Sequence, residues 1–201
     1  MMKLGNTLPL ARCPHCNIAH PHLEFVNVVD TTSNEKQNHR RWITYKCATC
    51  GGVTMAVAPY ANVRNQILDV ISDIWPAPQA VHDSVPERAK AYLEQAIASI
   101  AAPSGAVMLT ASAVDAMLKA KGLKDGSLNS RINTAAQNHL ITSDMAAWAH
   151  EVRLDANDQR HDDEAGAMPD EADAKKSIEF ATALAQFLFV LPARIARGRS
   201  R

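Results

Sequence analysis

The sequence predicts an α+β protein, in which a small β-rich unit precedes an all-helical unit. Two Cys-x-x-Cys pairs in the first 50 residues flank short segments rich in β-branched and aromatic residues. Pro76, Pro78 and Pro86 then interrupt the chain. Beyond them, apolar residues recur at the spacing of amphipathic helices. We therefore expect a β unit over 1–75, a proline-rich linker over 76–84 and a helical bundle over 85–201.

Composition places the chain among ordinary globular proteins, with 201 residues, 47% hydrophobic, 21% charged and a formal net charge of zero. Zero net charge argues against a global attraction to nucleic acid or to anionic membranes. The charge is nevertheless uneven, because up to residue 64 seven basic residues face three acidic ones. No apolar run follows the opening Met-Met-Lys, and no apolar stretch reaches the roughly 20 residues of a membrane span. We expect a cytoplasmic protein with reduced thiols and no membrane partner.

The chain has four cysteines, Cys13, Cys16, Cys47 and Cys50. Each pair can form a tight turn that aims two thiolates at one ion, and two such turns supply the tetrahedral sulfur set that zinc prefers. Gly51 and Gly52 follow the second pair, and glycine there permits the positive backbone dihedral that lets the chain fold back over the metal. Strands are predicted at Leu23 to Val29, Trp42 to Lys46 and Gly52 to Ala58, with a further one within Ile67 to Trp75. These features outline a zinc ribbon with one structural Zn²⁺, with a redox dithiol pair as the alternative.

The ribbon has three candidate roles. So small a sheet cannot bury much apolar area by itself, so the metal can serve simply as a folding staple. It can also dock a protein. The third role uses a basic stretch with an aromatic residue, in which Arg40, Arg41 and Trp42 are candidates for contact with the phosphates and bases of nucleic acid.

Helix boundaries in the second half can be read from capping residues. Ser84 and Glu87 predict a capping box at the first helix. A second helix is expected from about Ala106 to Lys121, Ser127 is expected to cap a third, and Ser143 or Asp144 a fourth. The last helix should begin near Pro169 and Asp170. It is apolar on two faces, so we expect the bundle to cover one face and a second copy of the chain to cover the other.

One segment of the fourth helix resembles a known family. Val152 to His161 reads VRLDANDQRH, with Arg153, Asn157 and His161 at four-residue intervals. This pattern resembles the bacterial domain of unknown function 4145, a HEPN-like domain (higher eukaryote and prokaryote nucleotide-binding) that often follows a zinc ribbon. The closing Phe187 to Arg194 resembles the same family. The family usually has an Arg and a Leu-Glu pair in its second helix, whereas here that Arg is absent and Asp115 stands roughly at the Glu position.

The resemblance implies a metal-independent endoribonuclease, in which Arg153, Asn157 and His161 act on the scissile phosphate while the RNA 2′-hydroxyl attacks. Such domains recur in toxin, phage-defence and restriction settings, and many are instead noncatalytic modules that bind RNA or a partner protein. They commonly form homodimers with these residues at the interface.

Residue spacing bears on this site. Arg153 and His161 lie about 12 Å apart along a straight helix, so the helix breaks near Asn157 or two chains share one site. The acidic residues around His161 favour its protonated form and repel RNA. Two alternatives stay open. Arg153 can pair with Asp155 or Glu151 while His161 caps a helix end, or His161, Asp162 and Asp163 can hold a divalent ion.

Overall fold

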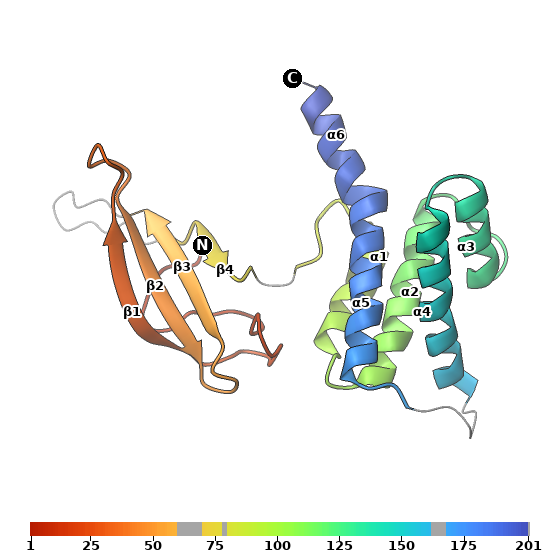
Figure 1. Ribbon diagram of the computed structural model, residues 1–201, viewed down its shortest axis with the longest axis horizontal. Helices are drawn as coiled ribbons and strands as arrows, with labels where there is room; N and C mark the ends of the chain where they lie inside the picture. Colours follow the sequence, from red (N-terminus) through yellow and green to blue (C-terminus); the bar gives the residue numbers. More distant parts are fainter. Residues whose placement is uncertain (60–69, 78–79, 162–167, 201) are drawn as a thin grey trace. The chain divides into compact units, whose positions relative to one another are not determined.

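The protein has the predicted α+β architecture, with a small antiparallel sheet followed by helices (Figure 1). The computed structural model describes residues 1–59, 70–77, 80–161 and 168–200, with the backbone alone at 154, 155 and 157–161. The chain divides into two compact units, Met1–Gln79 and Ala80–Arg201.

The first unit is built on a four-stranded antiparallel sheet in the order β1-β2-β3-β4. The strands are β1 (Leu23–Thr31), β2 (Arg40–Cys47), β3 (Val53–Pro59) and β4 (Asp73–Trp75). Three of them match the predicted strands to within two residues at either end. The fourth is short and lies within the segment expected to add a last strand. Each strand pairs with the next along the chain, as Figure 1 shows, so this meander forms from local contacts.

Alternation along the strands separates a buried face of the sheet from an open one. Ile43 and Tyr45 of β2, Ala56 of β3 and Ile74 of β4 share one face and pack against Leu8 and Leu23, among others. The Tyr45 hydroxyl lies inside this core and donates a hydrogen bond of 2.9 Å to the carbonyl oxygen of Gly5. This donation ties the N-terminal segment to the sheet.

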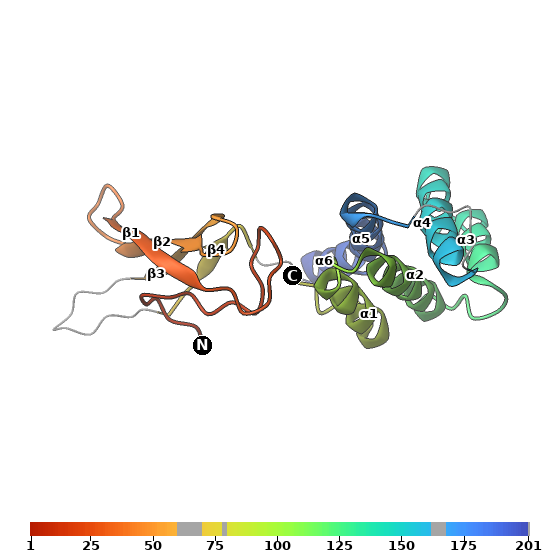
Figure 2. The same cartoon turned by 90° about the horizontal axis from the view of Figure 1, so that it is seen from below.

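The second unit is a bundle of helices in which α2 occupies the centre. Its elements are α1 (Glu87–Ala98), α2 (Pro103–Ala120), α3 (Leu128–Gln137), α4 (Ser143–His161), α5 (Glu171–Ala185), a π-helical turn η1 (Gln186–Val190) and α6 (Leu191–Arg199). Helix α2 contacts α1, α4 and α5, an arrangement visible nearly end-on in Figure 2. It contacts α3 as well, and many of its side chains are buried, as expected of a helix that is apolar around most of its circumference.

The observed helix ends confirm some of the predicted caps and correct others. Ser127 caps α3 as predicted, because its hydroxyl accepts from the Ser130 N–H at 3.2 Å. Asp170 caps α5 through a capping box, close to the predicted start. The capping box predicted at Ser84 is wrong. Helix α1 begins at Glu87 after Pro86, and the Ser84 hydroxyl instead contacts His82 Nδ1 at 2.9 Å. Neither residue proposed for α4 is its cap, because Thr142 Oγ1 accepts from the Met145 N–H.

The start of α2 also differs from the prediction. The helix begins at Pro103, where we expected proline to interrupt the helical pattern, and Gly105 lies inside it. Proline is tolerated in the first turn because its missing N–H would have no partner there in any case.

Elements α5, η1 and α6 form one helix of 29 residues, Glu171–Arg199, that is long and apolar enough to cross a membrane by length and composition. No uninterrupted apolar run in the sequence predicts this span, because polar residues such as Thr182 and Gln186 divide the segment. One such helix is weak support for a membrane span, because a core helix of a soluble protein passes the same test. Here Ile178, Phe180, Leu184 and Leu188 are buried in the helical core. The expectation of no membrane partner and a cytoplasmic location stays a prediction.

Candidate functional site

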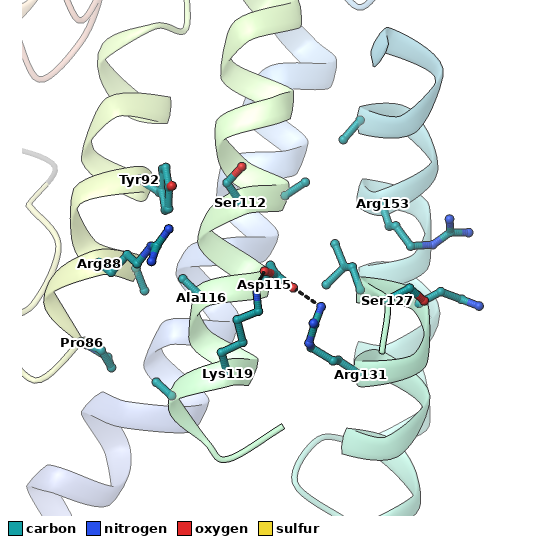
Figure 3. A pocket seen from close by; sticks show the side chains of 16 residues that line it. Pro86, Arg88, Tyr92, Ser112, Asp115, Ala116, Lys119, Ser127, Arg131 and Arg153 are labelled. Atoms are coloured by element: carbon teal, nitrogen blue, oxygen red, sulfur yellow. Dashed lines mark hydrogen bonds and ion pairs between the residues drawn. The ribbon is translucent and has the colours of Figure 1, made fainter. Parts of the chain in front are cut away.

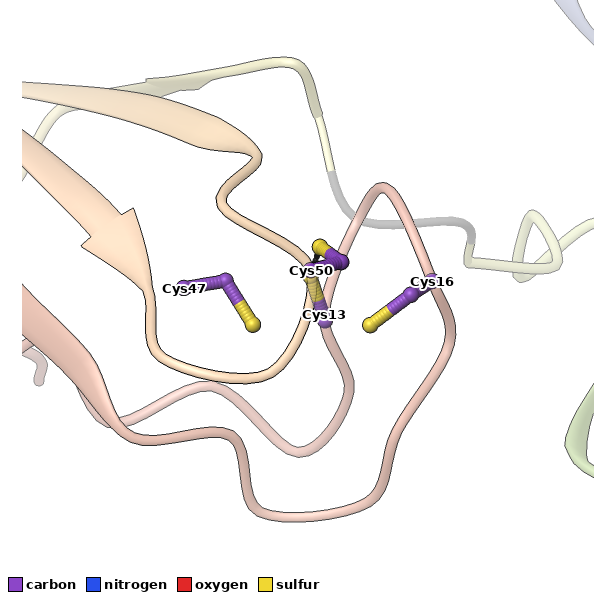
Figure 4. Close-up of side chains that lie close together, drawn as sticks. All are labelled: Cys13, Cys16, Cys47 and Cys50. Carbon is purple, nitrogen blue, oxygen red and sulfur yellow. Dashed lines mark hydrogen bonds between the residues drawn. The ribbon is translucent and has the colours of Figure 1, made fainter.

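The fold brings the four cysteines together from two loops. Cys13 and Cys16 lie in the loop before β1, and Cys47 and Cys50 lie at the turn between β2 and β3. Their four Sγ atoms all lie within 4.8 Å of one another, and those of Cys13 and Cys50 are 4.0 Å apart. Figure 4 shows the side chains of the two loops facing a common space. Four ligands about 2.3 Å from one ion at tetrahedral angles would lie about 3.8 Å apart, so the cluster fits a metal ion.

The two loops repeat one backbone design. In the first, the Asn17 N–H donates to the Cys13 carbonyl at 3.0 Å, and in the second the Gly51 N–H donates to the Cys47 carbonyl at 2.9 Å. Both donors have positive φ, 58° at Asn17 and 73° at Gly51. The positive φ predicted for Gly51 and Gly52 is confirmed at Gly51 and is wrong at Gly52, whereas Asn17 was not identified from the sequence. Asparagine is among the residues that tolerate this conformation best, so its place four residues after the first cysteine of a pair was the available signal.

Backbone N–H groups point at the sulfur atoms, as expected of loops built to hold thiolates. The N–H of His15 lies 3.4 Å from Cys13 Sγ, and that of Gly52 lies 3.4 Å from Cys50 Sγ. Burial raises the pKa of Cys47. Hydrogen bonds from the backbone at Cys50 and Thr49 lower it, and the net result is a pKa of about 7. Hydrogen bonding favours the ionised sulfur that binds a metal.

At Cys16, by contrast, the neighbouring thiols raise the pKa. A backbone hydrogen bond at Ile18 lowers the pKa of Cys16, yet burial and the adjacent Cys50 and Cys13 thiols raise it to about 12. Four thiolates packed this closely repel one another unless a cation lies between them. The donor set therefore fits a thiolate-binding metal ion, whose identity the geometry does not decide.

His15 joins the first loop to the sheet. Its Nε2 lies 2.8 Å from the carbonyl oxygen of Val53 at the start of β3. The imidazole also covers Gly52, where a Cβ would come within 2.5 Å of the ring. Glycine is thus required at position 52 for close approach, a different reason from the positive φ that favours it at position 51.

Arg153, Asn157 and His161, the three residues predicted to act on a phosphate, belong to α4. Arg153 is partly buried, and its Nε is buried with no hydrogen-bond partner among the side chains that the structure describes. Glu151, one of the two acids considered as its partner, instead accepts from Lys176 at 3.0 Å. Asn157 and His161 belong to α4, but their side chains lie outside the described part of the structure, as does that of Asp155. Asp162 and Asp163, considered as metal ligands with His161, lie outside the described residues altogether.

The backbone of α4 is helical from Ser143 to His161, so the break considered near Asn157 is absent. Arg153 and His161 therefore remain about 12 Å apart along one axis and about 80° apart around it.

A pocket of about 700 Å³ opens between α1, α2, α3 and α4. Among the lining residues that the structure describes, four are cationic, Arg88, Lys119, Arg131 and Arg153, and one is a carboxylate, Asp115, for a net formal charge of four minus one, or +3. Figure 3 shows Arg131 pointing toward Asp115, whereas the guanidinium of Arg153 points away from that pair.

Asp115 is held between two cations. Arg131 donates to its Oδ1 at 2.6 Å and also donates to the Lys124 carbonyl at 3.1 Å, while Lys119 Nζ lies 2.6 Å from Oδ2. The carboxylate at the position where the resemblance expects Glu therefore fastens α3 to α2. Sequence reasoning did not identify Arg131, because residues 16 positions apart on different helices carry no common local pattern.

The three residues proposed for nucleic-acid contact lie on opposite faces of the sheet. Arg41 is on the buried face and forms a bidentate pair with Asp30 at 2.8 and 2.7 Å, which lowers the pKa of that carboxyl. Arg40 and Trp42 are on the open face, beside a pocket of about 410 Å³. Trp75 of β4 lies 5.6 Å from Trp42 between ring centroids. Trp75 was assigned no role from the sequence.

These features define the class of protein, a two-unit α+β chain in which a small sheet with a four-cysteine cluster is followed along the chain by a helical bundle. A family model, Domain of unknown function (DUF4145), matches residues 94–201, more than half of the 201 residues, and the chain belongs to this family. A search of curated proteins found no match. A search of solved structures also found none.

Proposed function

We propose that this protein is a HEPN-like, nucleic-acid-associated protein with an N-terminal zinc ribbon. The observation that carries the proposal is the +3 pocket of the helical unit, which Arg153 of the motif shares with Arg88, Lys119 and Arg131. Guanidinium groups suit phosphate, because their planar forks match its oxygens. Arg153 Nε has no hydrogen-bond partner among the residues that the structure describes, so this side chain has hydrogen-bonding capacity left for such a ligand.

The metal of the ribbon is proposed to be zinc. Four cysteines with amide N–H groups directed at sulfur suit a closed structural site, in which the ion holds two loops that would otherwise repel. Purified protein should contain one zinc per chain. Cys47→Ser should lose it and destabilise the first unit, whereas Ser33→Ala on the same unit should keep it. A full-length protein that contains no zinc and four titratable thiols would contradict the assignment.

For the helical unit, we propose metal-independent cleavage of RNA at a site shared by two chains. Along the continuous α4, Arg153 and His161 are too far apart for one phosphate. A two-fold dimer would place Arg153 of one chain beside His161 of the other.

In the proposed reaction, the 2′-hydroxyl loses its proton to a general base and attacks phosphorus. The bond to the 5′-oxygen breaks, and that oxygen takes a proton from a general acid. A 2′,3′-cyclic phosphate and a 5′-hydroxyl remain. His161 would supply one of the two proton transfers, and Arg153 would stabilise the phosphate charge.

The test is cleavage of single-stranded RNA by the full chain, followed by analysis of the product ends. Arg153→Ala and His161→Ala should each lower the rate by about a hundredfold or more. His22→Ala, an exposed histidine of the other unit, is the matched control and should leave the rate unchanged. A short incubation with chelator should also leave it unchanged. Wild-type protein that leaves diverse RNAs intact would refute the enzymatic proposal.

An alternative function, noncatalytic docking through a dimer, is favoured by a separate observation. Phe187, Leu191 and Ile195 are large, apolar and exposed, and they recur every four residues on the last helix. Such a stripe is typical of a helix that packs against another. Leu191→Glu should reduce dimerisation in light scattering, whereas Gln186→Glu, an exposed polar position on the same helix, should not. A monomeric wild-type mass at micromolar concentration would oppose both the dimer and the shared active site.

A further inference from the structure

The open face of the first unit's sheet carries a second unusual feature, a pair of tryptophans beside an arginine. Trp42 of β2 pairs with Val57 of β3 and Trp75 of β4 pairs with Met55 of β3, two residues away, so the two tryptophans are on the same face. Their ring planes are tilted by 31° with centroids 5.6 Å apart, so the two indoles form a short stack. Aromatic side chains on an open sheet face are a common platform for the bases of single strands.

The two rings differ in how firmly they are held. Trp42 is partly buried, and its Nε1 donates to Thr31 Oγ1 at 2.8 Å, which fixes the plane of the ring. Trp75 is 42% exposed and lies at the outside of the stack. A base inserted between the rings would need about 6.8 Å, twice the spacing of about 3.4 Å between stacked bases, and the rings are closer than that. A base would therefore add to the exposed side of Trp75 rather than insert between the two rings.

Polar groups around the stack suit the other parts of a nucleotide. Arg40 lies two residues before Trp42 on the same face, is exposed, and has no hydrogen bond or ion pair within the described part of the chain. His39 is beside it. Asp73, two residues before Trp75, can accept a hydrogen bond from a base amino group. A pair of tryptophans with one carboxylate would by itself suit a cationic ligand. Arg40 and His39 beside them disfavour such a ligand.

We propose that Trp75, backed by Trp42 and flanked by Arg40, is a binding site for single-stranded nucleic acid, in which Trp75 stacks on a base and Arg40 binds a phosphate. This site is separate from the cationic pocket of the helical unit. It does not rest on the proposed ribonuclease activity, because stacking and phosphate binding need no 2′-hydroxyl.

The experiment uses the full chain and a fluorescein-labelled single-stranded DNA of about 12 nucleotides, read by anisotropy at several salt concentrations. DNA lacks the 2′-hydroxyl and cannot undergo the proposed cleavage, so binding is measured apart from activity. Trp75→Ala should weaken binding by about 5-fold to about 150-fold. Trp75→Phe keeps a ring that can stack and should retain most of the affinity. Arg153→Ala, in the other unit, should leave Trp75-dependent binding in place.

A substitution of Arg40 can be compared with the same substitution of its neighbour Arg41, which is the matched control. Arg40→Gln should weaken binding and make the dependence of log affinity on log salt shallower by about 0.7, the value for one phosphate contact on a single strand. Arg41→Gln removes the same charge from the opposite face and should leave that slope unchanged. Unaltered far-UV circular dichroism and metal content would show that each variant is folded.

Intrinsic fluorescence gives a second measurement. The chain has three tryptophans, and the third, Trp148, packs against Phe180 in the helical unit. In a Trp148→Phe variant the remaining signal comes from the proposed site, and it should be quenched by the oligonucleotide. Affinity that is unchanged in Trp75→Ala, or no quenching in the Trp148→Phe variant at saturating DNA, would overturn the proposal. Wild-type protein that binds no single-stranded DNA at low salt would also overturn it.

Discussion

Removal of the Asp115 carboxylate should destabilise the helical unit more than removal of any ordinary surface acid. Asp115 and Arg131 join α2 to α3 with side chains only 23% and 10% exposed. The hydrogen bond of 2.6 Å between them joins two charged groups, and such bonds contribute about 1.5–3 kcal/mol. Asp115→Ala would leave the buried Arg131 guanidinium with its Lys124 contact alone, since its Nε already lacks a partner. We expect the free energy of unfolding to fall by about 2–4 kcal/mol. This is less than the full cost of an isolated buried charge, because water reaches Asp115.

Asp83 provides the matched control. Its pair with Lys90 has the same length, 2.6 Å, but the Asp83 side chain is 93% exposed. Asp83→Ala should therefore leave the free energy of unfolding nearly unchanged, even though the Lys90 ammonium lowers the pKa of that carboxyl. Burial, and not the distance between the charged atoms, is the difference between the two sites.

The measurement is urea unfolding of the full chain followed by far-UV circular dichroism, to which the helical unit contributes most of the signal. The urea midpoint of Asp115→Ala should fall by roughly 1–2 M. The double variant Asp115→Ala with Arg131→Met removes both charges and should recover part of that loss. Equal midpoints for Asp115→Ala and Asp83→Ala would refute the reasoning, because the burial of the pair would then have no energetic consequence.

Three further predictions concern two glycines and one histidine. Gly52→Ala should speed metal release because a Cβ at this position would lie 2.5 Å from the His15 ring, and adding His15→Ala should reverse the effect. Gly105→Ala, a helical glycine with no atom within 4 Å of such a Cβ, should instead stabilise the bundle by about 0.5–1 kcal/mol in thermal unfolding. Burial, and next the Arg153 charge, lower the pKa of His150 below its ordinary value of 6.5. The folded state then binds this proton less readily than the unfolded chain, so the contribution of His150 to stability is complete above pH 6.5 and is lost as the pH falls through its folded-state pKa. NMR titration should find the His150 pKa below 6.5 in wild type and higher in Arg153→Gln, and a wild-type value at or above 6.5 would contradict this.

Local chemistry explains what could be predicted from the sequence. Strand and helix positions follow from the spacing of apolar residues, and Ser127 and Asp170 start helices because their side chains accept from N–H groups two or three residues away. The two Cys-x-x-Cys turns are equally local, since each depends on a few consecutive residues and a donor with positive φ. Where local signals compete, the prediction fails, as at Ser84, whose hydroxyl contacts His82 and does not cap α1.

The sequence by itself determined the α+β class, the approximate extent of most helices and strands, and the four cysteines that could serve as ligands. Only the tertiary structure brought the two cysteine pairs within 4.8 Å, stacked Trp75 beside Trp42, and paired Asp115 with Arg131 across 16 residues. It also showed that Arg40 and Arg41, adjacent in the chain, serve opposite faces of the sheet. The physical reason is that contacts between distant residues depend on strand register and helix packing. These are set by the whole core and leave no pattern in any short stretch of sequence.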